Sequence, residues 1–164
     1  MSTHAPSIPL PSVKNARFAI AVATWNSEFT YALRDGALEV LHSQGFTDAD
    51  IDVFYVPGAV ELTFAASQLI EASQYDAVIV FGCVIRGDTP HFDYVCQSVT
   101  QGVTALNADC DIPVIFGLLT VENEQQAYER IGGIHGHKGR EAAEAAIHMV
   151  DFARKICLCP RKIF

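Results

Sequence analysis

The chain has 164 residues, a formal net charge of −8 and a residue content that is 50% hydrophobic. This length predicts one domain with a packed core, and the acidic balance argues against a nucleic-acid partner. No apolar run approaches the roughly 18 residues of a membrane span, and residues 1–16 lack the apolar core of a signal peptide. We therefore expect a cytoplasmic globular protein with no membrane partner.

The cysteines indicate a reducing compartment. They are odd in number and scattered along the chain: Cys83, Cys96, Cys110, Cys157 and Cys159. We expect free thiols. Cys157 and Cys159 form a C-x-C, but no second ligand pair lies nearby to complete a metal site, so no metal is expected.

Residues 1–16 are proline-rich, show no clear hydrophobic period, and are expected to form an extended arm before a domain at residues 17–156. The apolar run Phe18–Ala23 predicts the first buried strand. A helix follows, with Ser27 as its N-cap, and it ends before Gly45.

A polar loop is predicted at Asp48–Asp52, and Val53–Val56 predicts the second strand. Pro57-Gly58 turns the chain. The apolar spacing from Leu62 to Ile70 then predicts the second helix.

The stretch Val78–Val95 combines a third strand, a tight turn and the start of a third helix. Val78–Ile85 is apolar throughout, as in a strand buried on both faces. The chain turns at Arg86–Pro90, and proline suits the first turn of a helix because its missing N–H is not needed there.

The last part of the chain predicts a fourth strand at Ile112–Leu119 and a short helix at Glu124–Arg130, for which Thr120 or Asn123 can supply a cap. The remaining segments are a flexible loop at Gly132–Gly139, a last helix at Arg140–Lys155 and a tail at 157–164.

Strand and helix alternate along the chain, which predicts a three-layer αβα sandwich around a four-stranded parallel sheet. No GxGxxG follows the first strand and no GxxxxGK[ST] is present. The usual nucleotide-binding folds therefore lose their support.

The carboxyl ends of parallel strands meet at one edge of a sheet, where open α/β sheets place their ligands. That edge would gather Trp25-Asn26, Pro57–Glu61, Arg86–His91 and, from the fourth strand, Phe116. Amides at the helix start favour an anion such as phosphate, and His91 titrates near neutral pH. The set suits a flat polar ligand that carries or accompanies a phosphate.

Each of these residues also has a purely structural interpretation. Trp25 can fill the core or the rim, and His91 can be a hydrogen bonder at a helix start. Glu61 and Arg130 can complement helix dipoles, and Lys138 can be a solvated charge. Their convergence favours a site.

Five motifs carry a family resemblance: Trp25-Asn26, Val56–Leu62, Gly82–Val95 (GCVIRGDTPHFDYV), Pro113–Gly117 and Gly136–Gly139. In this order and spacing the chain resembles the lumazine synthase (6,7-dimethyl-8-ribityllumazine synthase) family. The resemblance covers residues 17–156 and implies a flavodoxin-like fold.

The resemblance implies a transferase of the penultimate step of riboflavin biosynthesis. Its members condense 5-amino-6-ribitylamino-uracil with 3,4-dihydroxy-2-butanone 4-phosphate. The reaction forms an imine, releases inorganic phosphate, then closes the ring with loss of water. It uses no metal and no organic cofactor.

The resemblance also implies residue roles. His91 would be the catalytic residue that moves protons. The phosphate would be held by Gly87, Asp88, Thr89 and Arg130. The pyrimidine and its ribityl chain would be bound by Trp25, Asn26, Gly58, Ala59, Val60, Glu61, Val84, Ile85, Phe116 and Lys138. A carboxylate beside a phosphate is repulsive, so we expect the Asp88 side chain to face Arg86 or solvent.

In this family the site lies between subunits, with Phe116 and Arg130 supplied by the neighbour. The resemblance therefore implies a homo-oligomer, either a pentamer or a 60-mer shell of twelve pentamers, and the sequence leaves this choice open. Riboflavin synthase is a candidate partner.

Other activities would fit the same fold, because fold alone does not determine function. One is a flavin or lumazine binder without turnover, against which the joint presence of His91, Arg130 and Lys138 argues. The others are a structural shell protein with an idle site and a flavodoxin-like electron carrier.

Overall fold

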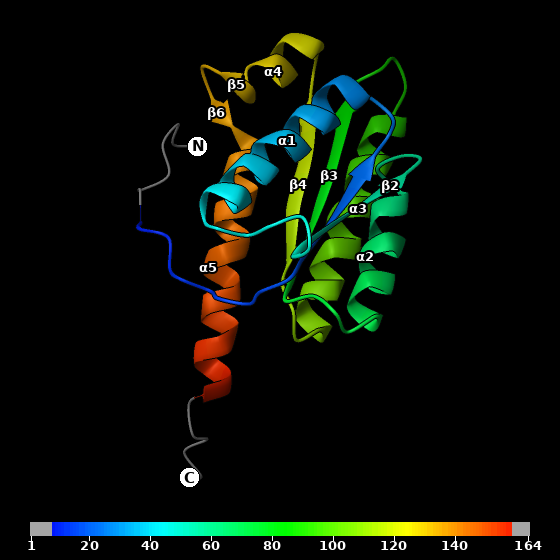
Figure 1. The fold of residues 1–164 in the computed structure, drawn as a ribbon. Coiled ribbons are helices and arrows are strands. Elements are labelled where there is room, and N and C mark those ends of the chain that lie inside the picture. Colours follow the sequence, from blue (N-terminus) through cyan, green and yellow to red (C-terminus); the bar gives the residue numbers. More distant parts are fainter. Residues whose placement is uncertain (1–7, 159–164) are drawn as a thin grey trace.

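The structure, a computed structural model, describes residues 8–158. Its centre is a parallel sheet whose strands lie in the order β2-β1-β3-β4 (Figure 1). The strands are β1 (Phe18–Ala23), β2 (Ile51–Val56), β3 (Ala77–Ile85) and β4 (Val114–Val121). The predicted four-stranded parallel sheet is confirmed.

Helices cover both faces of the sheet. Figure 1 shows α1 (Ser27–Ser43) and α5 (Lys138–Leu158) on one side, and α2 (Glu61–Glu71) and α3 (His91–Asp109) on the other. The architecture is a three-layer αβα sandwich of flavodoxin-like form, as the alternation of elements predicts.

The core has two layers, because successive strand residues point to opposite faces. On the α1 and α5 side, β1 contributes Phe18, Ile20 and Val22, all fully buried. On the α2 and α3 side it contributes only alanines, from Ala19 to Ala23. The small residues leave room for α2 and α3 to approach the sheet. On the other face, burial of each large apolar side chain stabilises the folded state by about 1.5–3 kcal/mol.

The second strand begins earlier than the sequence predicts, because Ile51 and Asp52 belong to β2 and not to a polar loop. Asp52 accepts hydrogen bonds from the Arg17 guanidinium and the Tyr75 hydroxyl, each at 2.9 Å. A charged residue is tolerated in an edge strand when its side chain has such hydrogen-bond partners. The sequence pattern does not show that Asp52 has them.

The N-cap of α1 is Asn26, and the prediction of Ser27 was wrong. Asn26 lies in the left-handed region at φ 57° and makes no side-chain cap. Its carbonyl accepts the N–H groups of Phe29 and Thr30 at 3.0 and 3.2 Å. Asparagine tolerates this conformation better than serine does.

The prediction of a flexible loop at Gly132–Gly139 was also wrong. After α4 (Glu124–Tyr128), the chain forms a short antiparallel hairpin, β5 (Ile131–Gly133) and β6 (Gly136–His137), and α5 already starts at Lys138. A side chain at Gly139 would overlap the backbone of Leu33 in α1. The absence of a side chain at Gly139 therefore allows α5 to pack closely against α1. The predicted cap by Asn123 is confirmed, since its side chain accepts the Gln126 N–H at 3.0 Å.

The last helix, α5, is longer than predicted at both ends and extends below the sheet in Figure 1. The remaining tail residues, 159–164, and the start of the arm, 1–7, lie outside the described residues. From residue 8 to 16 the arm has no helix or strand, but Val13 and Ala16 are buried. No helix within residues 8–158 is long and apolar enough to cross a membrane.

Candidate active site

A cavity of about 380 Å³ opens at the edge of the sheet where β1, β2 and β3 end, which we call the carboxyl edge. Its volume is in the range of small-molecule sites. It is lined by Trp25, Asn26, Gly58, Ala59, Val60, Glu61, Cys83, Val84, Ile85, Gly87, Thr89, His91, Phe92 and Val95. The predicted convergence of the three strand ends is therefore seen.

The strand order explains the position of the cavity. From β1 the chain first moves to one side, to β2, and later to the other side, to β3 and β4. Connections therefore leave the carboxyl ends of β1 and β3 in opposite directions. A crevice forms at such a switch point, where open α/β sheets bind ligands.

Hydrogen bonds connect the turn after β1 to the end of β3 and to the turn after β2. The Asn26 side-chain amide donates to the Cys83 carbonyl at 2.9 Å, which joins the end of β1 to β3. The Trp25 N–H donates to the Pro57 carbonyl at 3.0 Å, which joins it to the turn after β2. The walls of the cavity are thus set by backbone and amide contacts.

Trp25 leaves most of its indole uncovered, with 73% of its surface exposed. A large flat apolar side chain that is open to solvent at a cavity is available for stacking on a ring. The core-filling interpretation of Trp25 does not apply.

Glu61 is the first residue of α2, and its Oε2 accepts the Gly58 N–H at 2.9 Å. One carboxylate oxygen therefore holds the Pro57-Gly58 turn. The other has no hydrogen-bond partner in the part of the chain that the structure describes, and it remains available to a ligand.

The turn between β3 and α3 has the features that favour an anion. Gly87 and Thr89 line the cavity, and α3 begins at His91 without a side-chain cap. Uncapped N–H groups at a helix start favour an anion. The exposed His91 lies at the same place, as predicted.

Asp88, in the same turn, is exposed and does not line the cavity. Arg86 does not pair with it, because the guanidinium contacts Asp93 and Glu122 instead. Of the two expected directions for the Asp88 side chain, only solvent agrees with this arrangement.

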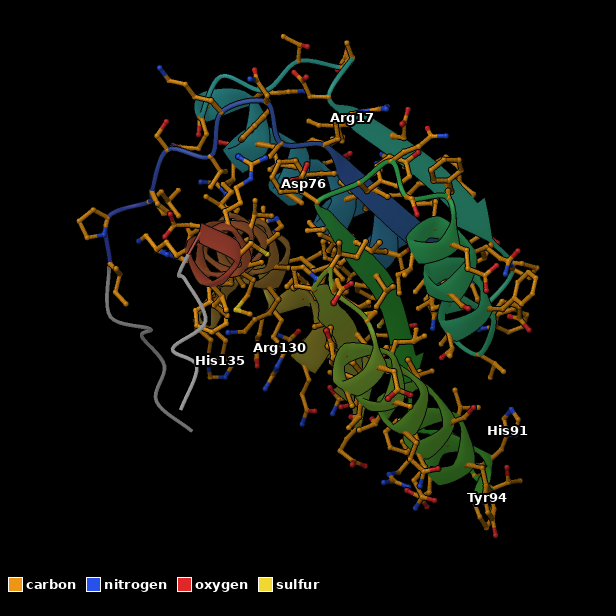
Figure 2. The ribbon with its side chains drawn as sticks, turned by 90° about the horizontal axis from the view of Figure 1, so that it is seen from below. Arg17, Asp76, His91, Tyr94, Arg130 and His135 are labelled. Carbon is orange, nitrogen blue, oxygen red and sulfur yellow. The ribbon has the colours of Figure 1, made fainter. Side chains whose placement is uncertain are left out.

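Besides Asp88, three predicted site residues do not line this cavity. Phe116 is the third of the eight residues of β4, opposite Val80, so the expectation that it reaches the carboxyl edge was wrong for a single chain. The Arg130 guanidinium donates to the Gln126 carbonyl at 2.7 Å, and Lys138 pairs with Glu141, also at 2.7 Å. Figure 2 shows His91 and Arg130 far apart.

The candidate residues taken from the sequence do not include Phe92, Val95 or Cys83, all of which line the cavity. Val95 could have been predicted from the sequence, because it lies four residues after His91 and therefore on the same face of the helix. Burial raises the pKa of the Cys83 thiol to about 12, so this group is no nucleophile at neutral pH. No group of three or more His, Cys, Asp or Glu that could hold a metal ion is found within residues 8–158.

The fold and the cavity define an α/β protein with a cavity of small-molecule size at the carboxyl edge of its sheet, lined by an exposed indole, a turn before an uncapped helix start and an imidazole. The sequence matches a family model described as 6,7-dimethyl-8-ribityllumazine synthase over residues 15–154. The chain therefore belongs to the 6,7-dimethyl-8-ribityllumazine synthase family.

Individual relatives support this membership. The chain is 51% identical to a 6,7-dimethyl-8-ribityllumazine synthase of Phocaeicola vulgatus over 147 residues, which cover 90% of this chain and 88% of the relative. It is 52% identical to the protein of that name from Porphyromonas gingivalis, with 88% and 90% covered. The corresponding identity is 54% for Bacteroides fragilis, with 83% and 95% covered.

Proposed function

We propose that this chain is a transferase that forms 6,7-dimethyl-8-ribityllumazine from 5-amino-6-ribitylamino-uracil and 3,4-dihydroxy-2-butanone 4-phosphate. This is the penultimate step of riboflavin biosynthesis. The observation that carries the proposal is that an exposed indole, an amide-lined turn and an imidazole line one cavity, in a chain about half identical to proteins named for this activity.

The cavity walls suit the pyrimidine substrate. Its ring would stack on Trp25 and meet the backbone of Val84 and Ile85, which end β3. The ribityl hydroxyls would bond to the free oxygen of Glu61 and to the backbone of Gly58–Val60. Asn26 already donates to Cys83, so its side chain offers the ligand mainly its carbonyl oxygen.

The turn Gly87–Thr89 would bind the phosphate of the second substrate through backbone N–H groups. Attack of the 5-amino group on the ketone loses water and gives the imine. Inorganic phosphate then leaves with a proton from the adjacent carbon. Ring closure by the ribitylamino nitrogen loses a second water molecule.

His91 would accept and return protons in these steps. It lines the cavity beside the turn, and a positioned imidazole contributes about 10²–10⁴-fold to such transfers. Holding two substrates together contributes a further effect of up to roughly 7–11 kcal/mol.

We also propose that a second copy completes the site with Phe116 and Arg130. Phe116 leaves 43% of its surface exposed on β4, which is an edge strand. Arg130 lies away from the cavity of its own chain (Figure 2). The proposal implies a pentamer, alone or as twelve pentamers in a shell, and it keeps riboflavin synthase as a candidate partner. Since both substrates are small water-soluble molecules, we propose a cytoplasmic location.

The test is to mix both substrates with the purified chain and to follow lumazine fluorescence together with phosphate release. We expect equal amounts of the two products. Substrate binding without either product would support a non-catalytic binder, and a chain purified with tightly bound flavin would support an electron carrier. Native mass measurement gives the oligomer.

A further inference from the structure

Arg86 immediately precedes the turn Gly87–Thr89, and its side chain joins elements on both sides of it. Nε donates to Glu122 Oε2 at 2.8 Å, and Nη2 donates to Asp93 Oδ1 at 3.1 Å. The guanidinium carbon lies 4.1 Å from the centre of the Phe92 ring. The Arg86 N–H also donates to the Val121 carbonyl at 2.9 Å.

These partners come from the two ends of the turn. Glu122 directly follows β4, which pairs with β3 just before the turn. Phe92 and Asp93 are in the first turn of α3, where the phosphate-binding segment ends. Arg86 thus fixes the end of the sheet relative to the start of the helix that carries His91.

The turn itself has little other support. Residues 87–89 are exposed, and apart from Gly87 and its two chain neighbours no atom lies within 4 Å of the place where a side chain on Gly87 would begin. An exposed glycine-containing turn has high backbone freedom. Its conformation therefore depends on how its two ends are held.

The charges argue against direct phosphate binding by Arg86. One guanidinium faces two carboxylates, Asp93 and Glu122, so the three groups together carry a net negative charge. A bound phosphate would meet no uncompensated positive charge from Arg86. Arg86 is also absent from the lining of the cavity.

We propose that Arg86 is a positioning residue, which orients the Gly87–Thr89 amides toward the phosphate and holds His91 beside them. This inference rests on the proposed function for the identity of the substrate. Both ion pairs are partly exposed, with side chains 37–57% accessible, and such pairs add little to stability. Their effect should appear in substrate binding rather than in the unfolding temperature.

The test compares Arg86→Gln and Glu122→Gln with Arg154→Gln as the matched control. Arg154 also bonds a carboxylate, Asp76 at 2.9 Å, and the Lys14 carbonyl. Asp76 directly precedes β3, so this contact lies at the amino edge of the sheet, and Figure 2 shows Asp76 far from His91. We expect the KM of the phosphate substrate to rise about ten- to hundredfold in the first two variants. The KM of the pyrimidine substrate should not change, and the control should match the unaltered chain.

Glu122→Gln separates positioning from direct binding by the sign of its effect. If Arg86 were a phosphate ligand, removing a competing carboxylate would free its charge and lower both the KM of the phosphate substrate and the inhibition constant of inorganic phosphate. Positioning predicts that both constants rise. Unchanged or lowered constants in Glu122→Gln overturn the proposal.

Hydrogen exchange of the Asp93 and Tyr94 amides, which donate to the Pro90 carbonyl at the start of α3, provides a readout that does not need turnover. We expect faster exchange in Arg86→Gln and Glu122→Gln and none of this change in Arg154→Gln. Equal exchange rates in all variants overturn the positioning role. If the unaltered chain shows no turnover, the proposed function is contradicted. The role of Arg86 is then tested by the exchange rates alone.

Discussion

The Asn26 side-chain amide donates a hydrogen bond to the Cys83 carbonyl at 2.9 Å, across the crevice between β1 and β3. The same residue lies in the left-handed region at φ 57° and starts α1. One asparagine therefore sets both the direction of the helix and the spacing of two cavity walls.

Replacing Asn26 by glycine or by alanine should separate these two roles. Both variants lose the amide, so we expect each to raise the KM of the pyrimidine substrate about tenfold. Only alanine strains the left-handed backbone, so Asn26→Ala should be less stable than Asn26→Gly by about 1 kcal/mol. Urea unfolding and steady-state kinetics measure the two effects, and equal stability of the variants would contradict the backbone argument.

The sequence predicted the sheet and most helices well because buried strands and amphipathic helices have strong periodic signals. The N-cap of α1 was misplaced by one residue because asparagine and serine are about equally good caps by residue type. What decided it was the left-handed conformation of Asn26, which allows its amide to reach Cys83. That partner is distant in the sequence, and local patterns do not report such contacts.

The site residues, too, could be predicted only where their positions do not depend on contacts distant in the sequence. The strand-end residues could be placed because parallel strands share one carboxyl edge. Phe116 could not, because its position depends on the register of β4 against β3, where it lies opposite Val80. The hairpin β5–β6 was taken for a flexible loop because its glycines were counted as flexible, whereas Gly133 of the hairpin lies close to the backbone of Glu129.

Gly139→Ala should destabilise the protein, with Gly87→Ala as the control. A methyl group on Gly139 would overlap the Leu33 backbone, which cannot yield as a side-chain end can, whereas nothing lies near Gly87. We expect Gly139→Ala to lower the free energy of unfolding by about 1–3 kcal/mol, and Gly87→Ala to change it by less than about 0.5 kcal/mol. Urea unfolding of both variants checks this, and similar values for the two would refute it.

Cys83 should resist alkylation in the folded protein. Burial raises the pKa of its thiol to about 12, so almost no thiolate is present at pH 8. Cys157 is exposed at the end of α5 and should react first. Iodoacetamide labelling followed by peptide mass mapping measures both sites. Rapid modification of Cys83 without unfolding would show that the cavity gives access to its thiol.

His137 should make the folded state sensitive to acid. Burial lowers the pKa of its imidazole below the usual 6.5, Arg140 lowers it further, and Glu39 and Glu141 act in the opposite direction. The imidazole packs against Gly36, and its Nδ1 has no partner within residues 8–158. The unfolded chain then binds the proton more readily, so the contribution to stability is complete above pH 6.5 and decreases as the pH falls toward the lowered pKa.

Urea unfolding between pH 8 and pH 5 tests this assignment. We expect the unaltered chain to lose stability below about pH 6.5, and the loss to be smaller in His137→Gln, which cannot take up that proton. The comparison between the two chains matters because all their other ionisable groups are the same. An identical pH slope would exclude His137 as the source.

Mixed oligomers provide the sharpest test of a site shared between protomers. His91→Ala removes the proposed proton carrier, and turnover should fall by about 10²–10⁴-fold. The exposed position of His91 predicts that assembly persists. Arg130→Ala should raise the KM of the phosphate substrate more than that of the pyrimidine, since Arg130 is proposed to reach the phosphate of the neighbouring site.

Co-expression of the two variants with different affinity tags yields hybrids that can be purified through both tags. If His91 and Arg130 of one site come from different protomers, random pairing leaves about a quarter of the sites with both residues intact. Turnover at low phosphate substrate should then exceed that of either variant alone. If both residues of a site came from one chain, every site would lack one of them. Hybrids would then be no more active than the average of the two parents, whatever their assembly state.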